Sequence, residues 1–146
     1  MKTFITLSFI IVTMINAQGQ TLVRQGEYAS GKILYNWDGV YLRQGQYPSG
    51  KILISWDGTF IRKGQYPSGT ILYNWDGQYF RQSAYKSGKI LYNWDGKYIR
   101  QGQYNSGKIL YNFDGQYIRQ GEYSSGKILL NIEGKLPVAI LIYILE

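Results

Sequence analysis

A 19-residue unit, repeated six times without insertion, constrains the fold of this chain more than any other feature. The copies run from Thr21 to Gly134, and "YNWDGKYIRQGQY" at 92–104 is typical of them. Self-similarity at a fixed period indicates units that bury their apolar surface against one another. We therefore expect a single β-hairpin repeat domain over 18–146, with a tail at 135–146 and repeats at 21–39, 40–58, 59–77, 78–96, 97–115 and 116–134.

Each unit has the sequence pattern of a β-hairpin. The segment "ILYNW" is rich in β-branched and aromatic residues, Asp-Gly follows it, and "KYIR" resumes the same character. This pattern favours two strands joined by a type I′ turn whose glycine takes a positive φ. A longer turn, "RQGQYNSGK", joins successive hairpins. Ser83 replaces its first glycine in the fourth unit, which predicts that a positive φ is not required there.

The pairing register follows from the position of the turn. A turn centred on Asp95-Gly96 would pair Trp94 with Lys97 and Tyr92 with Ile99. Both faces of such a hairpin are largely apolar, so we expect each hairpin to pack against neighbours on both sides.

The number of complete hairpins predicted from the Asp-Gly turns is five. Pro137 follows the sixth turn and cannot donate to a strand ladder, so 22–24 and 128–132 remain as half-hairpins that would close the array. The expected fold class is all-β: a closed or stacked array of five β-hairpins with a hydrophobic C-terminal closing segment. The complete hairpins are expected at 33–43, 52–62, 71–81, 90–100 and 109–119.

The two ends of the chain are apolar. Lys2, an uncharged apolar run and Ala17 before Gln18 predict a secretory signal peptide at 1–17, and thus a secreted, periplasmic or cell-envelope protein. A membrane anchor or a buried first strand is the alternative, but the run falls short of the roughly 20 residues of a spanning helix. The tail "VAILIYILE" is also too short to cross a bilayer, so no transmembrane segment is expected after cleavage. We expect the tail to be a closing strand or short helix buried against the hairpins, and the alternative is an exposed membrane or partner contact.

The repeat, the hairpin count and the ending "LLNIEGKLPVAILIYIL" resemble the exported bacterial proteins described as five-fold beta-flower proteins. The similarity covers nearly the whole mature chain, in units of the form aromatic-x-Asp-Gly-x-x-Ile-Arg-x-Gly followed by a hydrophobic segment after Gly-Lys-Leu-Pro. The resemblance implies a small all-β fold of radiating hairpins in proteins of unknown function. It offers no catalytic residues to transfer.

The composition argues against catalysis. The chain contains neither cysteine nor histidine, which excludes a thiol catalyst and removes the commonest general base and metal ligand. Each unit normally supplies one turn aspartate, so a pair of facing carboxylates would have to come from two hairpins. "YNWDG" resembles part of a calcium loop, but the remaining oxygen ligands are missing. We expect no enzymatic activity, no cofactor and no metal.

Two sets of side chains are candidates for ligand binding. Aromatic rings near the hairpin tips could stack on sugars or on quaternary ammonium groups, or they could be core. Arginines that follow an aromatic residue by two positions could grip an acidic polysaccharide, or could stack on that ring or pair with a carboxylate. The candidates are Trp37, Trp56, Trp75, Trp94, Tyr41, Tyr79, Tyr98, Tyr117, Arg43, Arg62, Arg81, Arg100 and Arg119.

These observations predict a non-enzymatic structural or interaction module of the bacterial cell envelope. The alternative function is a lectin-like carbohydrate-binding module that uses the hairpin-tip aromatics. The net charge of +7 amounts to about one positive charge per repeat, which favours a polysaccharide or an envelope protein as partner. Nucleic acid is not expected for an exported protein. A lectin needs its aromatic faces exposed, whereas a scaffold needs them buried.

Overall fold

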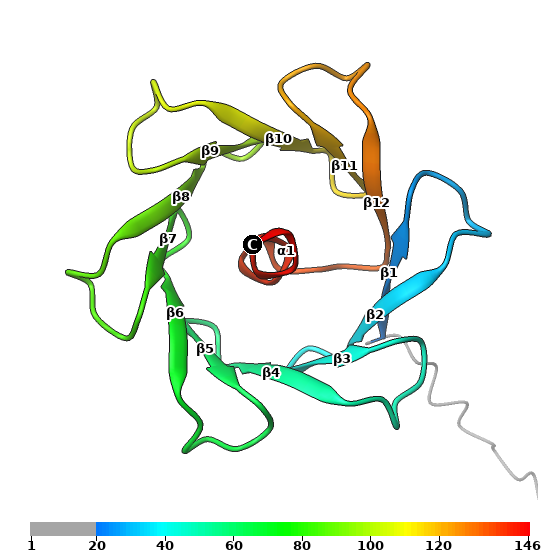
Figure 1. The fold of residues 1–146 in the computed structure, drawn as a ribbon, viewed down its shortest axis with the longest axis vertical. Helices are drawn as coiled ribbons and strands as arrows, with labels where there is room; N and C mark the ends of the chain where they lie inside the picture. The colour runs from blue at the N-terminus through cyan, green and yellow to red at the C-terminus, as the bar shows by residue number, and fades with distance from the viewer. Residues whose placement is uncertain (1–19) are drawn as a thin grey trace, which may run out of the picture.

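The computed structural model describes residues 20–146, so the expected signal peptide at 1–17 lies outside the described residues. Twelve antiparallel strands close into a barrel, and one helix follows them in the chain. The strands surround the helix (Figure 1). In chain order the elements are β1 (Thr21–Gln25), β2 (Ile33–Trp37), β3 (Tyr41–Gln44), β4 (Ile52–Trp56), β5 (Phe60–Lys63), β6 (Ile71–Trp75), β7 (Tyr79–Gln82), β8 (Ile90–Trp94), β9 (Tyr98–Gln101), β10 (Ile109–Phe113), β11 (Tyr117–Gln120), β12 (Ile128–Glu133) and α1 (Val138–Leu145).

The barrel closes where its first and last strands meet. Strands β1 and β12 pair with each other, with Val23 opposite Ile132 and Arg24 opposite Asn131. Within β2 and β3 the corresponding pair is Trp37 opposite Leu42. The two half-hairpins therefore form a sixth hairpin equivalent to the other five. The predicted all-β closed array is confirmed, with its five complete hairpins and with the end strands closing it. The ring is nevertheless six-fold and not five-fold, because the paired end strands act as a sixth unit.

Hairpins join edge to edge and do not pack face to face. Strand β3 pairs with β4, β5 with β6, and each such junction carries a register irregularity of the β-bulge type, for example between Leu42 and Arg43. A closed barrel leaves no unpaired strand edge. The expectation that neighbours pack on both faces of a hairpin is therefore not met, since one face lines the barrel interior.

The narrow turns differ from the predicted type I′ geometry. Trp94 lies opposite Ile99 and Asn93 opposite Arg100, a shift of two residues from the predicted register. Gly96 has φ +99°, whereas Asp95 does not have a positive φ, and a type I′ turn needs a positive φ at both central residues. A shift of two leaves every side chain on its predicted face because the strand period is two.

The core is a ring of inward-facing side chains contributed once per hairpin. In the second strand of each hairpin, Leu42, Ile61, Phe80, Ile99, Ile118 and their counterpart Val23 in β1 have almost no exposed surface. Opposite them stand Trp37, Trp56, Trp75, Trp94, Phe113 and Ile132.

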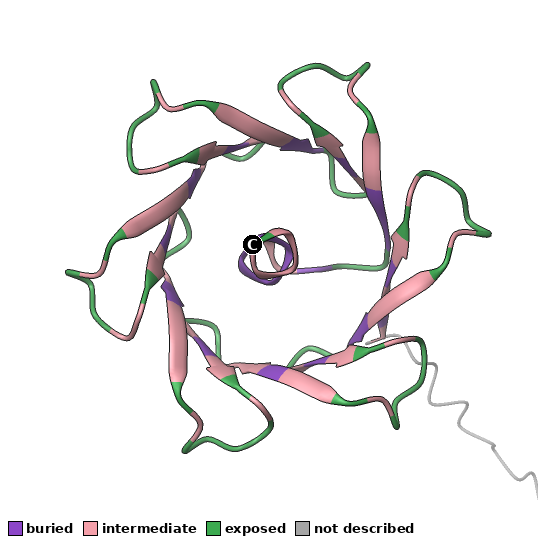
Figure 2. Ribbon diagram, viewed as in Figure 1, coloured by how far each residue is buried: buried purple, intermediate pink, exposed green. Residues whose placement is uncertain are grey.

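Helix α1 occupies the interior of the barrel (Figures 1 and 2). Its sequence, VAILIYIL, is apolar on all sides, and such a helix is stable only when it is surrounded. Ala139, Ile140, Leu141 and Ile142 are buried, and Tyr143 meets Tyr73 of β6 edge-on with 6.3 Å between ring centroids. Of the two forms expected for the tail, a closing strand or a short helix, the tail takes the helix, and it completes the core.

Six outer loops project from the barrel (Figure 1) and are largely exposed (Figure 2). They join the paired strands of neighbouring hairpins and cover 26–32, 45–51, 64–70, 83–89, 102–108 and 121–127. Ser83, at the start of the fourth loop, has φ +72°. The expectation that this position escapes a positive φ is wrong: the loop imposes the left-handed conformation on serine as well as on glycine.

Candidate functional site

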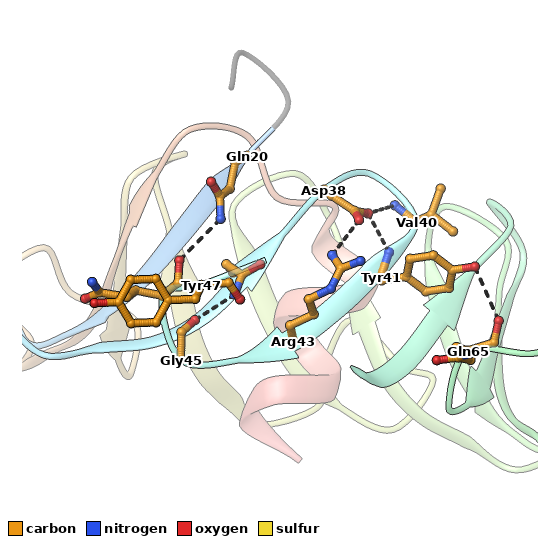
Figure 3. A network of polar contacts seen from close by, with 10 residues as sticks. Gln20, Asp38, Val40, Tyr41, Arg43, Gly45, Tyr47 and Gln65 are labelled. Carbon is orange, nitrogen blue, oxygen red and sulfur yellow. Dashed lines mark hydrogen bonds and ion pairs between the residues drawn. The ribbon is translucent and has the colours of Figure 1, made fainter. Parts of the chain in front are cut away.

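The narrow turns are held by their aspartates. Asp38 Oδ1 accepts hydrogen bonds from the backbone N–H groups of Val40 and Tyr41, both at 2.8 Å, and its Oδ2 accepts one from Arg43 at 2.5 Å (Figure 3). The same three bonds recur at Asp57, Asp76, Asp95 and Asp114. The carboxylates therefore have a structural role in the turns.

The arginines are paired within their own hairpins. Arg24 pairs with Glu133 across the closure, and the other five pair with the turn aspartates. Their side chains are only 12–20% exposed. Each of the five also lies 5.1–5.3 Å from the centroid of the ring two residues before it. Arg43, Arg62, Arg81, Arg100 and Arg119 are therefore not a free row of positive charge, and the stacked and paired alternative holds.

The turn carboxyls have lowered pKa values as a result. Partial burial alone would raise the pKa of Asp95, but hydrogen bonds from Arg100 and from the backbone N–H groups of Tyr98 and Lys97, together with the Arg100 charge, outweigh it. The net pKa is lowered at all five turn aspartates. These groups stay ionised at neutral pH, where each is paired with an arginine.

The tryptophans pack against the core. Trp37 is buried, and Trp56, Trp75 and Trp94 are partly buried against the core cluster. Trp94 contacts Phe113 of the next hairpin at 6.3 Å between centroids. The candidates Tyr41, Tyr79, Tyr98 and Tyr117 are partly buried beneath their arginines. Part of these rings stays accessible, since Trp94 and Phe113 line one shallow groove and Tyr41 and Trp56 line another.

The outer loops are built to a fixed shape by buried asparagines. The side-chain amide of Asn93 donates to the carbonyl oxygens of Gly102 at 2.8 Å and Tyr104 at 3.3 Å. Equivalent pairs of bonds start from Asn36, Asn74, Asn112 and Asn131. Asn131 reaches Gly26 and Tyr28, so it ties the first loop to the last strand.

A glycine late in each loop permits its close fold. A Cβ on Gly107 would lie 2.3 Å from the Gln101 carbonyl oxygen and 3.0 Å from that of Tyr104. The N–H of Gly107 donates to the Tyr104 carbonyl, which closes a tight turn after the tyrosine. The backbone of this tyrosine is therefore held on both sides while its side chain is left outside.

Six tyrosine side chains protrude from these loops. Each is 64–71% exposed, and apart from Val40 they are the only large hydrophobic residues among 20–146 that are exposed. The tyrosines are Tyr28, Tyr47, Tyr66, Tyr85, Tyr104 and Tyr123. Sequence reasoning did not select them as site residues.

A signal for these tyrosines was present in the repeats. The residue after tyrosine is Ala, Pro, Pro, Lys, Asn and Ser in the six units, whereas the tyrosine itself never changes. The backbone conformation of the loop explains why the glycines and the Ser-Gly pair recur in every unit. No packing contact explains why the exposed tyrosine also recurs. In two loops a glutamate precedes the tyrosine, and its hydrogen bond and charge raise the pKa of Tyr28 and of Tyr123.

Shallow grooves lie between neighbouring outer loops. One is lined by Glu27 and Tyr28 of the first loop and by Ser124, Ser125 and Lys127 of the sixth. Another is lined by Lys108 of the fifth loop and by Glu122 and Tyr123 of the sixth. Each of these grooves thus combines an aromatic ring from one loop with an ammonium group from its neighbour.

The unpaired charge of the molecule gathers on the same loops. Within 20–146 the six arginines cancel six of the nine acids, which leaves nine lysines against Glu27, Glu122 and Glu146. Seven of the nine lysines are exposed in or beside the outer loops: Lys32, Lys51, Lys63, Lys86, Lys89, Lys108 and Lys127. The positive field of the protein is therefore centred on the outer loops.

No group of three or more acidic side chains within 20–146 could hold a metal ion. Across the same residues, no helix has the length and apolar character needed to cross a membrane.

Comparison with known proteins agrees with the six-fold ring. A family model described as "6-fold beta flower protein" matches residues 23–141, which is most of the chain. No curated protein and no solved structure matches this chain. The expected relationship to beta-flower proteins is thus confirmed at the level of the fold, with six hairpin units in place of five. The chain belongs to the family of 6-fold beta flower proteins.

Proposed function

We propose that this protein is a non-enzymatic interaction module of the cell envelope that binds carbohydrate through its six outer loops. The observation that carries the proposal is the ring of six tyrosines, each 64–71% exposed, on loops of which five are held by hydrogen bonds from a buried asparagine. A tyrosine ring held in this way offers a flat apolar face and a hydroxyl at little entropic cost. Sugar rings present matching C–H faces and hydroxyl groups.

The proposal moves the lectin hypothesis from the hairpin tips to the outer loops. The tip tryptophans pack against the barrel core and the tip arginines are engaged by aspartates, so both sets are less accessible to a ligand than the loop tyrosines. An extracytoplasmic location is part of the proposal because the sequence at 1–17 has the pattern of a secretory signal.

A glycan array carrying neutral and acidic oligosaccharides tests this function with two multiple variants. In the first, all six loop tyrosines are replaced by alanine. In the second, W56F, W75F and W94F introduce the residue that Phe113 already provides in the fifth hairpin. We expect the first variant to lose glycan binding and the second to keep it, with both folded by circular dichroism.

All six tyrosines are replaced together because the proposed site is weak and present in six copies, so a single substitution would leave five copies able to bind the glycan. Each contact alone is shallow, and the avidity of a multivalent ring exceeds the affinity of any single site. Binding that persists without the loop tyrosines but disappears in the tryptophan variant would contradict the proposal, as would a protein that binds no glycan.

A further inference from the structure

The grooves between outer loops have a composition that goes beyond general sugar binding. In the two grooves that contain Tyr28 and Tyr123, the lysine comes from the end of the preceding loop, Lys127 and Lys108 respectively. A third groove, at the junction of the fourth and fifth loops, is lined by Lys89, Gln101 and Gly102. The cyclic order of the loops therefore places a lysine before five of the six tyrosines.

The same junction recurs around the ring by repetition. Lysine ends five of the six outer loops, and Thr70 ends the third. Lys108 lines a groove together with Tyr123, and Lys127 lines one together with Tyr28. By its position in the repeat, Lys32 corresponds in the same way to Tyr47, Lys51 to Tyr66 and Lys89 to Tyr104. Thr70 with Tyr85 is the exception, and it shows that the loop fold does not require a lysine.

These lysines take part in no ion pair among residues 20–146, although Glu27 lines the groove of Lys127 and Glu122 lines the groove of Lys108. Within 20–146 every ion pair of the structure involves an arginine, and the lysines at the loop ends are exposed. An ammonium group beside an aromatic face can pair with a carboxylate while the ring covers the adjacent apolar surface. Serine hydroxyls at 124 and 125 line the same groove and can bond sugar hydroxyls.

We propose that the lysine–tyrosine junctions are subsites for the acidic sugars of a polyuronate-type polysaccharide, with tyrosine stacking on the ring and lysine pairing with the carboxylate. This inference rests on the proposed function and names its ligand class. The outer loops radiate around the barrel (Figure 1), so a flexible polymer can follow several junctions in turn. A flat membrane would meet only one side of such a ring.

The test compares two matched pairs of lysines in the full chain. K108T and K127T together remove the ammonium groups from the grooves of Tyr123 and Tyr28, and introduce the residue that the chain itself uses at 70. K97T and K135T together remove the same charge from exposed positions outside the outer loops. Affinity for polygalacturonate is measured by calorimetry at low and moderate salt.

We expect the groove pair to lower the affinity at least about fivefold and the control pair to lower it less than about twofold. The salt dependence should also be weaker for the groove pair, because fewer ammonium groups contact the polymer. Equal losses in the two pairs would overturn the inference, since a diffuse field would then account for the binding.

Ligand controls separate this inference from the proposed function. Fully methyl-esterified polygalacturonate keeps the sugar and removes the charge, so we expect much weaker binding than to the acid form. Equal binding of the two forms, abolished by the tyrosine substitutions, would overturn the acidic ligand and leave the carbohydrate function standing. Tighter binding of dextran sulfate or of single-stranded poly(dT) than of polygalacturonate would overturn the carboxylate class. No binding to any of these polymers or to neutral glycans would overturn both.

Discussion

At the scale of single residues, the molecule depends on a few polar side chains that bond to the backbone. The asparagine of "YNW" is buried in five hairpins and donates two hydrogen bonds to an outer loop. In the second unit Ser55 takes its place, and no such bond to the loop at 64–70 is formed among the described residues. The shape of five outer loops is thus fixed by an asparagine, whereas the loop at 64–70 has no asparagine to hold it.

This difference predicts opposite effects for two substitutions. N93A removes the two hydrogen bonds that the buried Asn93 amide donates to the outer loop, and should lower the free energy of unfolding by about 1–3 kcal/mol. S55N introduces the missing amide and should raise it by about 1 kcal/mol. Urea unfolding of the two variants beside the parent measures both effects. A neutral N93A would mean that the loop glycines alone hold the loops.

The aspartate turns predict a loss of stability in acid. Their folded pKa values are lowered, so their contribution is fully present above the ordinary aspartate pKa of about 3.9 and is lost as the pH falls through the folded values. The urea midpoint should therefore decline steadily from about pH 4 downwards. D95N, which cannot titrate at one turn, should reduce the decline. A midpoint that is unchanged down to pH 2.5 would contradict the role of these ion pairs.

At the scale of elements, the barrel and its helix depend on each other. Twelve short strands enclose an interior that their own side chains do not fill, and the apolar helix α1 occupies it. Pro137 starts the helix, and its carbonyl oxygen accepts hydrogen bonds from the N–H groups of Ile140 and Leu141. The proline that ends the strand pattern in the sequence thus begins the element that fills the core.

A charge placed in this helix should break the core. Ile140 has no exposed surface, so I140D buries a carboxylate without a partner and should lower the free energy of unfolding by more than about 4 kcal/mol. I140V removes one methyl group from the same site and should cost only about 0.5–1.5 kcal/mol. Circular dichroism during urea unfolding measures both. An I140D protein with the parent midpoint would show that the barrel is stable without the helix inside it.

Local patterns in the sequence predicted the strands, the faces and the burial of the tail, because each depends on neighbours close in the chain. The register of the turns was wrong by two residues because the Asp95 side chain bonds to the N–H groups of Lys97 and Tyr98, which moves the turn onto Gly96-Lys97. The closing role of the two end strands was predicted, but their direct pairing into a sixth unit was not, because these strands lie at opposite ends of the repeat array. The loop tyrosines recur in every unit but were not selected, because repetition alone does not show which side chains are exposed.

At the scale of the whole molecule, repetition creates both the fold and the surface. Each unit contributes one inward aliphatic or aromatic residue to a common core and one tyrosine to the outside. Because the arginines are neutralised within the hairpins, the lysines of the outer loops set the charge of that surface. A ring of equal and individually weak subsites suits a polymer of repeating sugars, since affinity then grows with the number of units engaged.

The most direct test of this account is nitration of tyrosine, mapped by mass spectrometry, with and without saturating polygalacturonate. We expect the exposed Tyr47, Tyr66, Tyr85 and Tyr104 to react fastest in the free protein, followed by the equally exposed Tyr28 and Tyr123, whose pKa values the preceding glutamates raise. Tyr73, Tyr92 and Tyr143 should react slowly, because burial raises their pKa values and leaves less of the reactive phenolate. Polygalacturonate should protect the loop tyrosines alone. Loop tyrosines that stay fully reactive while the polymer is bound would contradict the account.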